Sequence, residues 1–124
     1  MIAADTSSLS SFFKGEEATD SRLVQIALNA RDLVLPPVVV TEMLSDPLAH
    51  QDMLETVAKF PLLPILDGYW IRASNNRRNL WQKGFKAKVA DSLIAQSCID
   101  HDIALIARDG DFRHFAKHCG LKLA

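Results

Sequence analysis

Short apolar runs alternate with stretches of helical periodicity along this chain. The runs at 1–4 (MIAA), 32–35 (DLVL), 62–66 (LLPIL) and 103–107 (IALIA) predict short strands, because a strand that is buried on both faces is continuously apolar. Pro64 has no N–H donor, so the 62–66 strand is expected at a sheet edge or with irregular pairing. Residues 121–124 (LKLA) are a candidate for a further short strand.

Helices are predicted over 6–14, 18–30, 38–46, from 47 onward, after 66 with a break near Gly84, over 88–102 and after 108–112. The 38–46 segment (VVVTEMLSD) is ambiguous, because its β-branched residues favour a strand. The Glu-Met-Leu that follows them favours a helix, and Asp46 and Pro47 are expected to cap and begin the next one. The alternation of strands and helices predicts an α/β fold with a mainly parallel sheet, as a single domain over 1–124.

Acidic residues follow the predicted strands. Asp5 comes after the first strand, Glu42 lies just past the second, and Asp109 and Asp111 come after 103–107. Asp91 lies near the start of the 88–102 helix, on a small, apolar face. Ligand sites in parallel α/β sheets form beyond the carboxyl ends of the strands, so these acids are expected to meet at one edge.

Composition and charge narrow the classes of protein. Hydrophobic residues make up 48% and charged residues 23% of 124 residues, which is typical of a folded domain. No apolar run is long enough for a membrane span, and two cysteines make no disulfide framework, so a reducing, cytoplasmic location is expected.

The net charge is −1, but the segment from Gly68 to Ala90 contains no acid. Its basic residues Arg77, Arg78, Lys83, Lys86 and Lys88 are candidates for RNA binding, although a solvated helix face is the commoner origin of such a run. Trp70 and Trp81 lie in the same segment, and tryptophans of this kind are more often core residues than stacking platforms.

Clustered carboxylates repel one another unless a cation neutralises them. A ligand set of oxygen atoms without histidine or cysteine suits Mg²⁺ or Mn²⁺. Such ions activate water for the hydrolysis of phosphodiesters, so the acids together with the basic segment predict a metal-dependent nuclease.

Four segments of the chain carry a resemblance to a known family. The segments IAADTSSL, PPVVVTEML, VADSLIAQ and LIARDGDF resemble the four acidic motifs of PIN-domain nucleases, in the right order and over nearly the whole chain. The nearest relatives appear among the VapC-like toxins of toxin–antitoxin pairs. The sequence departs from the family pattern at Ala107, where many relatives carry Thr or Ser.

The resemblance implies a three-layer α/β/α fold and an endoribonuclease that uses Mg²⁺ or Mn²⁺. It assigns the catalytic, metal-binding acids to Asp5, Glu42, Asp91 and Asp109, with Asp111 as a possible fifth acid and Ser7 as a polar residue near the metal. The implied partners are an RNA substrate and a small antitoxin that covers the acidic site, and homodimers are common in the family. Leu9, Phe12 and Phe13 are candidates for antitoxin docking or for the core.

Each acid also has a simpler interpretation on its own. Asp5 is a favoured N-cap, Glu42 a solvated helix acid and Asp91 a first-turn acid stabilised by the helix dipole. Of the pair in RDGDF, Asp111 is expected to cap the last helix. Two other functions remain open: a catalytically inactive PIN-like module that binds RNA or protein, and a receiver-like signalling domain, which the lone Asp5 and the Arg108 after the late strand disfavour.

Overall fold

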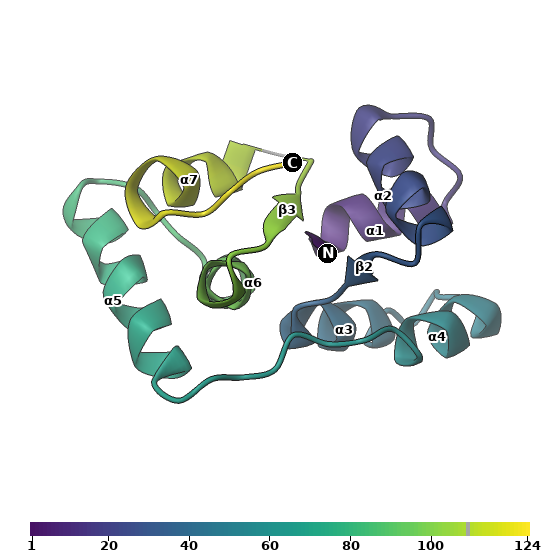
Figure 1. Cartoon of the computed structure of the whole chain (residues 1–124), viewed down its shortest axis with the longest axis horizontal. Helices are drawn as coiled ribbons and strands as arrows, with labels where there is room; N and C mark the ends of the chain where they lie inside the picture. Colours follow the sequence, from purple (N-terminus) through teal and green to yellow (C-terminus); the bar gives the residue numbers. More distant parts are fainter. Residues whose placement is uncertain (109) are drawn as a thin grey trace.

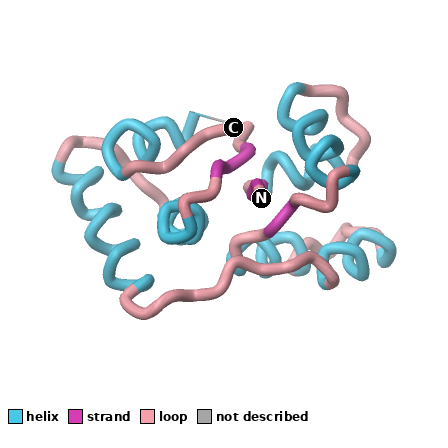
Figure 2. The backbone as a smooth tube through the Cα atoms, viewed as in Figure 1, coloured by secondary structure: helices cyan, strands magenta, loops and turns pink. Residues whose placement is uncertain are grey.

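A small parallel sheet lies at the centre of the molecule. In the computed structural model, which describes residues 1–108 and 110–124, its strands are β1 (Ile2–Ala4), β2 (Leu33–Val34) and β3 (Ala104–Ile106). The order is β2-β1-β3, and both neighbours run parallel to β1. Figure 2 shows these short strands between helices that make up most of the chain.

The helices are α1 (Thr6–Phe13), α2 (Thr19–Asn29), α3 (Pro37–Leu44), α4 (Gln51–Ala58), α5 (Tyr69–Gln82), α6 (Val89–His101), the short 3₁₀ helix η1 (Gly110–Phe112) and α7 (Arg113–Cys119). α1 and α2 lie on one side of the strands, whereas α5, α6 and α7 lie on the other (Figure 1). Helices therefore cover both faces of a parallel sheet, and the predicted α/β/α architecture is confirmed.

The sheet and its flanking helices share one core. Ala3 and Ala4 of β1, Leu105 of β3, Leu9 of α1 and Ala95 of α6 are all inaccessible to solvent. The two alanines in the central strand leave room for helices to approach both faces closely. Leu9 is thus a core residue and not part of a docking surface. None of the helices in the described part of the chain is long and apolar enough to cross a membrane.

The ambiguous 38–46 segment is helical, as predicted, and Pro37 occupies its first turn, where its missing N–H costs nothing. The prediction for the next helix was wrong. Asp46 accepts a hydrogen bond from the Leu48 N–H at 2.9 Å and so forms a local turn, and α4 begins only at Gln51.

The strands predicted at 62–66 and 121–124 are reduced to single bridges, from Leu62 to Leu35 and from Leu123 to Leu105. Leu63 still donates its N–H to the Leu35 carbonyl at 3.0 Å. Pro64 comes next and cannot donate, which accounts for the early end of the pairing.

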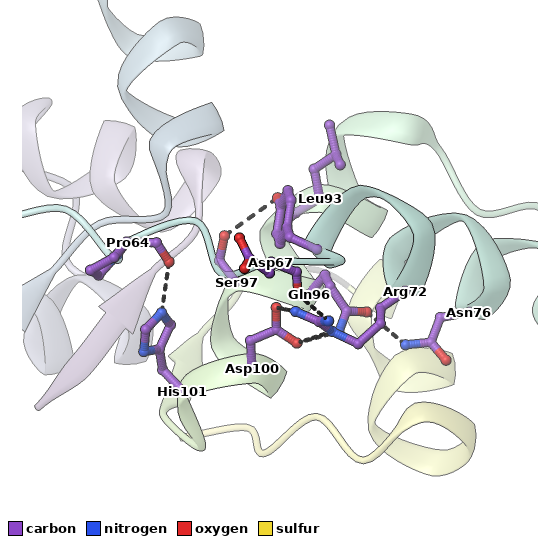
Figure 3. A network of polar contacts seen from close by, with 10 residues as sticks. Pro64, Asp67, Arg72, Asn76, Leu93, Gln96, Ser97, Asp100 and His101 are labelled. Atoms are coloured by element: carbon purple, nitrogen blue, oxygen red, sulfur yellow. Dashed lines mark hydrogen bonds and ion pairs between the residues drawn. The ribbon is translucent and has the colours of Figure 1, made fainter.

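A polar network fastens α5 to α6 (Figure 3). Arg72 of α5 donates to both carboxylate oxygens of Asp100 at 2.9 and 2.6 Å, and Asn76 donates to Gln96 at 2.7 Å. Gln96 in turn donates to Asp100 at 2.8 Å. Bidentate arginine–carboxylate pairs fix geometry as well as adding energy, so the two helices are held at a defined spacing.

Candidate active site

Four acidic side chains from separate segments line one cavity of about 210 Å³. Asp5 follows β1, Glu42 lies on α3, Asp91 on α6 and Asp111 in η1, beyond β3. The other polar side chains that line it are Thr6, Ser7 and Lys88. The cavity therefore lies at the carboxyl edge of the sheet, where the sequence predicted that the acids would meet.

Asp5 joins the sheet to the first helix. Its N–H donates to the Ile106 carbonyl at 3.0 Å, and its Oδ1 accepts from the Ser8 N–H at 2.8 Å as the N-cap of α1. Only 2% of the residue is exposed. Asp5 is therefore both the N-cap of α1 and a member of the acidic cavity, because its side chain accepts the Ser8 hydrogen bond and also lines the cavity.

Glu42 is held by a residue that the motifs did not single out. The Thr6 hydroxyl donates to Glu42 Oε1 at 2.6 Å, which joins the first residue of α1 to α3. The sequence offered one indication of this role: Thr6 directly follows the first acid and carries a hydroxyl at the start of a predicted helix. Ser7, which the resemblance gave as a polar residue near the metal, is exposed and also lines the cavity.

Asp91 lies in the first turn of α6, where the helix dipole favours a carboxylate. It is half-buried, and its neighbours Ala87 and Ile94 are buried. Ala90 and Ile94 line the acidic cavity together with Asp91, so the apolar face that carries this carboxylate borders the cavity. Lys88, the N-cap residue of α6, adds one cation to its lining.

The PIN-domain family model matches residues 2–118. The chain belongs to the PIN-domain family. No curated protein matches it by sequence. Among solved structures, it is similar to VapBC2 from Rickettsia felis bound to a DNA fragment from their promoter, with a TM-score of 0.75 and 16% identity over 100% of this chain and 98% of that one. It is also similar to VapBC-5 from Mycobacterium tuberculosis, with a TM-score of 0.66 and 21% identity over 98% and 95% of the two chains.

The segment after β3 corrects one assignment in this PIN domain. Asp111 was expected to cap the last helix, but the N-cap position of α7 is occupied by Phe112, whose side chain makes no capping hydrogen bond. Asp111 lies instead in η1 and borders the acidic cavity. Asp109 lies outside the described residues, so its assignment as a catalytic acid stays a prediction.

The contacts of Arg108 are a further feature that the motifs did not reveal. This arginine donates to Asp20 Oδ2 at 3.0 Å and Glu16 Oε2 at 2.8 Å, and also to the Ser11 hydroxyl. Burial acts to raise the pKa of Asp20, but the hydrogen bond from Arg108 contributes to a net lowering, so this carboxylate stays ionised. The arginine thus ties the end of β3 to the α1–α2 region of the PIN domain.

The basic segment divides into two groups. The Arg77 side chain donates to the Ala87 carbonyl at 2.8 Å and is occupied within the fold. Arg78, Lys83, Lys86 and Lys88 are exposed, and of these only Lys88 lines the acidic cavity. RNA binding by any of them stays a prediction.

The side-chain oxygen atoms that line the cavity come from four carboxylates and from the hydroxyls of Thr6 and Ser7. Oxygen ligands of this kind suit a hard divalent ion. Within the described residues, no three Asp, Glu, His or Cys side chains are grouped so as to hold a metal ion. Mg²⁺ commonly keeps several waters and takes only one or two carboxylates from the protein, so the residues present fit it in that mode.

Proposed function

We propose that this PIN domain is a Mg²⁺- or Mn²⁺-dependent endoribonuclease and the toxin of a VapBC-like toxin–antitoxin pair. One observation carries the proposal: carboxylates from the N-cap of α1 and from α3, α6 and η1 meet around a single cavity at the carboxyl edge of the sheet. Clustered carboxylates repel one another, and a bound divalent cation would offset that repulsion.

Asp5, Asp91 and Glu42 are the residues that would hold the ion, directly or through waters, with Asp111 beside them. A bound divalent ion would offset the charge of a phosphodiester and favour attack by water. Thr6 holds Glu42 in place through its hydroxyl, and Lys88, which also lines the cavity, would bind a phosphate oxygen. Asp109 is proposed to complete the acidic set or to orient the attacking water.

A larger groove adjoins the acidic cavity and suits an antitoxin segment. It has a volume of about 380 Å³, lies between α1, α3 and α4, and shares Thr6 and Glu42 with the cavity. Phe13, Met43 and Met53 line it together with the exposed Leu48. An apolar segment in this groove would end beside the acids, where a basic side chain could bind. Phe13→Glu should therefore abolish a stable complex with the cognate antitoxin.

The decisive experiment compares cleavage of cellular RNA with Mg²⁺, Mn²⁺ or a chelator. Asp5→Asn and Asp91→Asn should lose cleavage while keeping the fold, whereas Asp52→Asn, at an exposed position on α4, should cleave like the wild type. Sequencing the new 5′ ends would identify the RNA and the site of cutting. Equal cleavage by wild type and both cavity variants would contradict the assignment.

The second candidate is a PIN-like module that binds RNA without cutting it, through the exposed Arg78, Lys83, Lys86 and Lys88. Tight RNA binding with no turnover at saturating Mn²⁺ would support that function over the nuclease.

A further inference from the structure

A second cavity, of about 340 Å³, lies between α5 and α6. Arg77, Arg78 and Trp81 line it from α5, and Val89, Ser92 and Leu93 from α6. The Arg72–Asp100 and Asn76–Gln96 contacts hold the two helices at a fixed spacing (Figure 3). The cavity is therefore a formed feature of the fold and does not need to open for a ligand.

Trp81 forms a fixed aromatic wall of this cavity. It is 53% exposed, which overturns the expectation that it belongs to the core. Its indole N–H donates to the Ala87 carbonyl at 3.1 Å, and the Arg77 guanidinium lies 5.0 Å from the ring centroid. Since Arg77 donates to the same carbonyl, the ring is oriented on two sides. A ligand that stacks on it would lose little additional freedom.

The two cavities share the first turns of α6. Lys88, Ala90 and Asp91 face the acidic cavity, whereas Val89, Ser92 and Leu93 face the second one. A helix with its side chains is about 10 Å across. A chain that has a phosphodiester among the acids can therefore place a neighbouring base in the second cavity.

The charge around the second cavity suits a polyanion. Residues 68–90 contain no acid. The exposed Arg78 lines the cavity, and the exposed Lys86 and Lys88 lie just before the lining residue Val89 in the sequence. Single-stranded RNA is recognised by stacking its unpaired bases on aromatic rings and guanidinium planes, while cations bind its backbone. Trp81 with Arg78 supplies both kinds of contact.

We propose that the α5–α6 cavity is a base-binding subsite for single-stranded RNA. A base that flanks the phosphodiester in the acidic cavity stacks on Trp81, and Arg78 binds the adjoining backbone. Arg77 is a positioning residue that holds the indole, not an RNA contact. The proposal rests on the proposed nuclease function and adds to it the place where a base that flanks the cleaved bond would bind.

The test is a comparison of Trp81→Leu, Trp81→Phe and Trp70→Leu in the cleavage of a short single-stranded RNA with Mn²⁺. Trp70 is a matched control, since it is 59% exposed on the same helix but does not line the cavity. Loss of one stacked base should raise KM about 10-fold in Trp81→Leu, with a smaller change in kcat. Trp81→Phe keeps a ring and should restore most of the affinity, and Trp70→Leu should match the wild type. Thermal unfolding of each variant would show that its fold is intact.

A substrate series lacking one base at a time makes the test specific. At the flanking position, the missing base should raise the wild-type KM about 10-fold and have no further effect in Trp81→Leu, as expected of one shared contact. An active wild type whose KM is unchanged in Trp81→Leu would overturn the subsite alone. A wild type that neither cuts nor binds RNA would overturn the nuclease and the subsite together. Loss of antitoxin binding in Trp81→Leu, with an unchanged KM for RNA, would assign the cavity to a protein partner.

Discussion

The hydroxyl of Thr6 donates to Glu42 Oε1 at 2.6 Å. The residue next to the first acid, Asp5, thus connects the first acidic motif of this PIN domain to the second. Thr6 begins α1, directly after the N-cap Asp5, so the hydrogen bond fixes α3 relative to the start of α1. The position of the Glu42 carboxylate thus depends on α1, the helix that Asp5 caps.

Thr6→Val should weaken metal-dependent activity without unfolding the protein, because valine keeps the shape of threonine and removes the donor. Residues that orient a metal-binding carboxylate typically change metal affinity or activity by about 10-fold or more. The concentration of Mn²⁺ needed for half-maximal cleavage should rise to that extent. Thr6→Ser keeps the hydroxyl and should behave like the wild type; an equal change in both variants would point to packing instead.

Substitutions of Asp5 should separate its two roles. Asn is as good an N-cap as Asp, so Asp5→Asn should keep α1 while removing a charge from the acidic cavity. Asp5→Ala should lose the cap to Ser8 as well and lower the free energy of unfolding by about 1 kcal/mol. Urea denaturation measures the difference. Equal stability of the two variants would show that the Ser8 hydrogen bond contributes nothing.

Asp111 should matter for activity and not for folding. Its side chain borders the acidic cavity and does not cap α7. Asp111→Asn is therefore expected to slow RNA cleavage or to raise the Mn²⁺ requirement, with an unchanged unfolding midpoint. A drop in stability with normal cleavage would restore the capping interpretation that the sequence suggested.

Asp100 should make the fold sensitive to acid. Hydrogen bonds from Arg72 hold its pKa below the ordinary value of 3.8, and its side chain is only 6% exposed. The unfolded chain binds this proton more readily, so the stabilisation is complete at neutral pH and is lost as the pH falls below about 4.

Asp100→Asn should lower the free energy of unfolding at pH 7 by about 1–3 kcal/mol and flatten its decline in acid. The matched control is Asp102→Asn. Asp102 is 79% exposed, has a left-handed backbone that asparagine tolerates, and pairs with the exposed Lys122. Urea denaturation across a pH series measures both variants; a similar loss in each would remove the special role of the Arg72–Asp100 pair.

Periodicity and motif order predicted the α/β layers and the approximate helix bounds, since apolar patterns report which faces are buried. They did not predict details that depend on tertiary contacts. The reach of the 62–66 pairing was limited by Pro64, and the start of α4 was shifted by the Asp46 turn.

The cavity acids could be proposed because strand ends are recognisable in a sequence. Thr6 and Arg108 could not, since each acts through a partner far along the chain: Thr6 through Glu42, and Arg108 through Asp20 and Glu16. Composition also misplaced Trp81, because nothing local distinguishes a tryptophan in the core from one that lines a surface cavity.

The strand order β2-β1-β3 has a consequence for synthesis of the chain. β1 is made before both of its neighbours, and β3 (Ala104–Ile106) is made only after β2 and the helices α3 to α6. Until that segment leaves the ribosome, one edge of β1 has no strand to pair with, and Asp91 and Asp111 have no completed sheet edge on which to meet Asp5. The acidic cavity therefore arises only after β3 has been made, and a translation product interrupted before Ala104 carries no assembled set of acids.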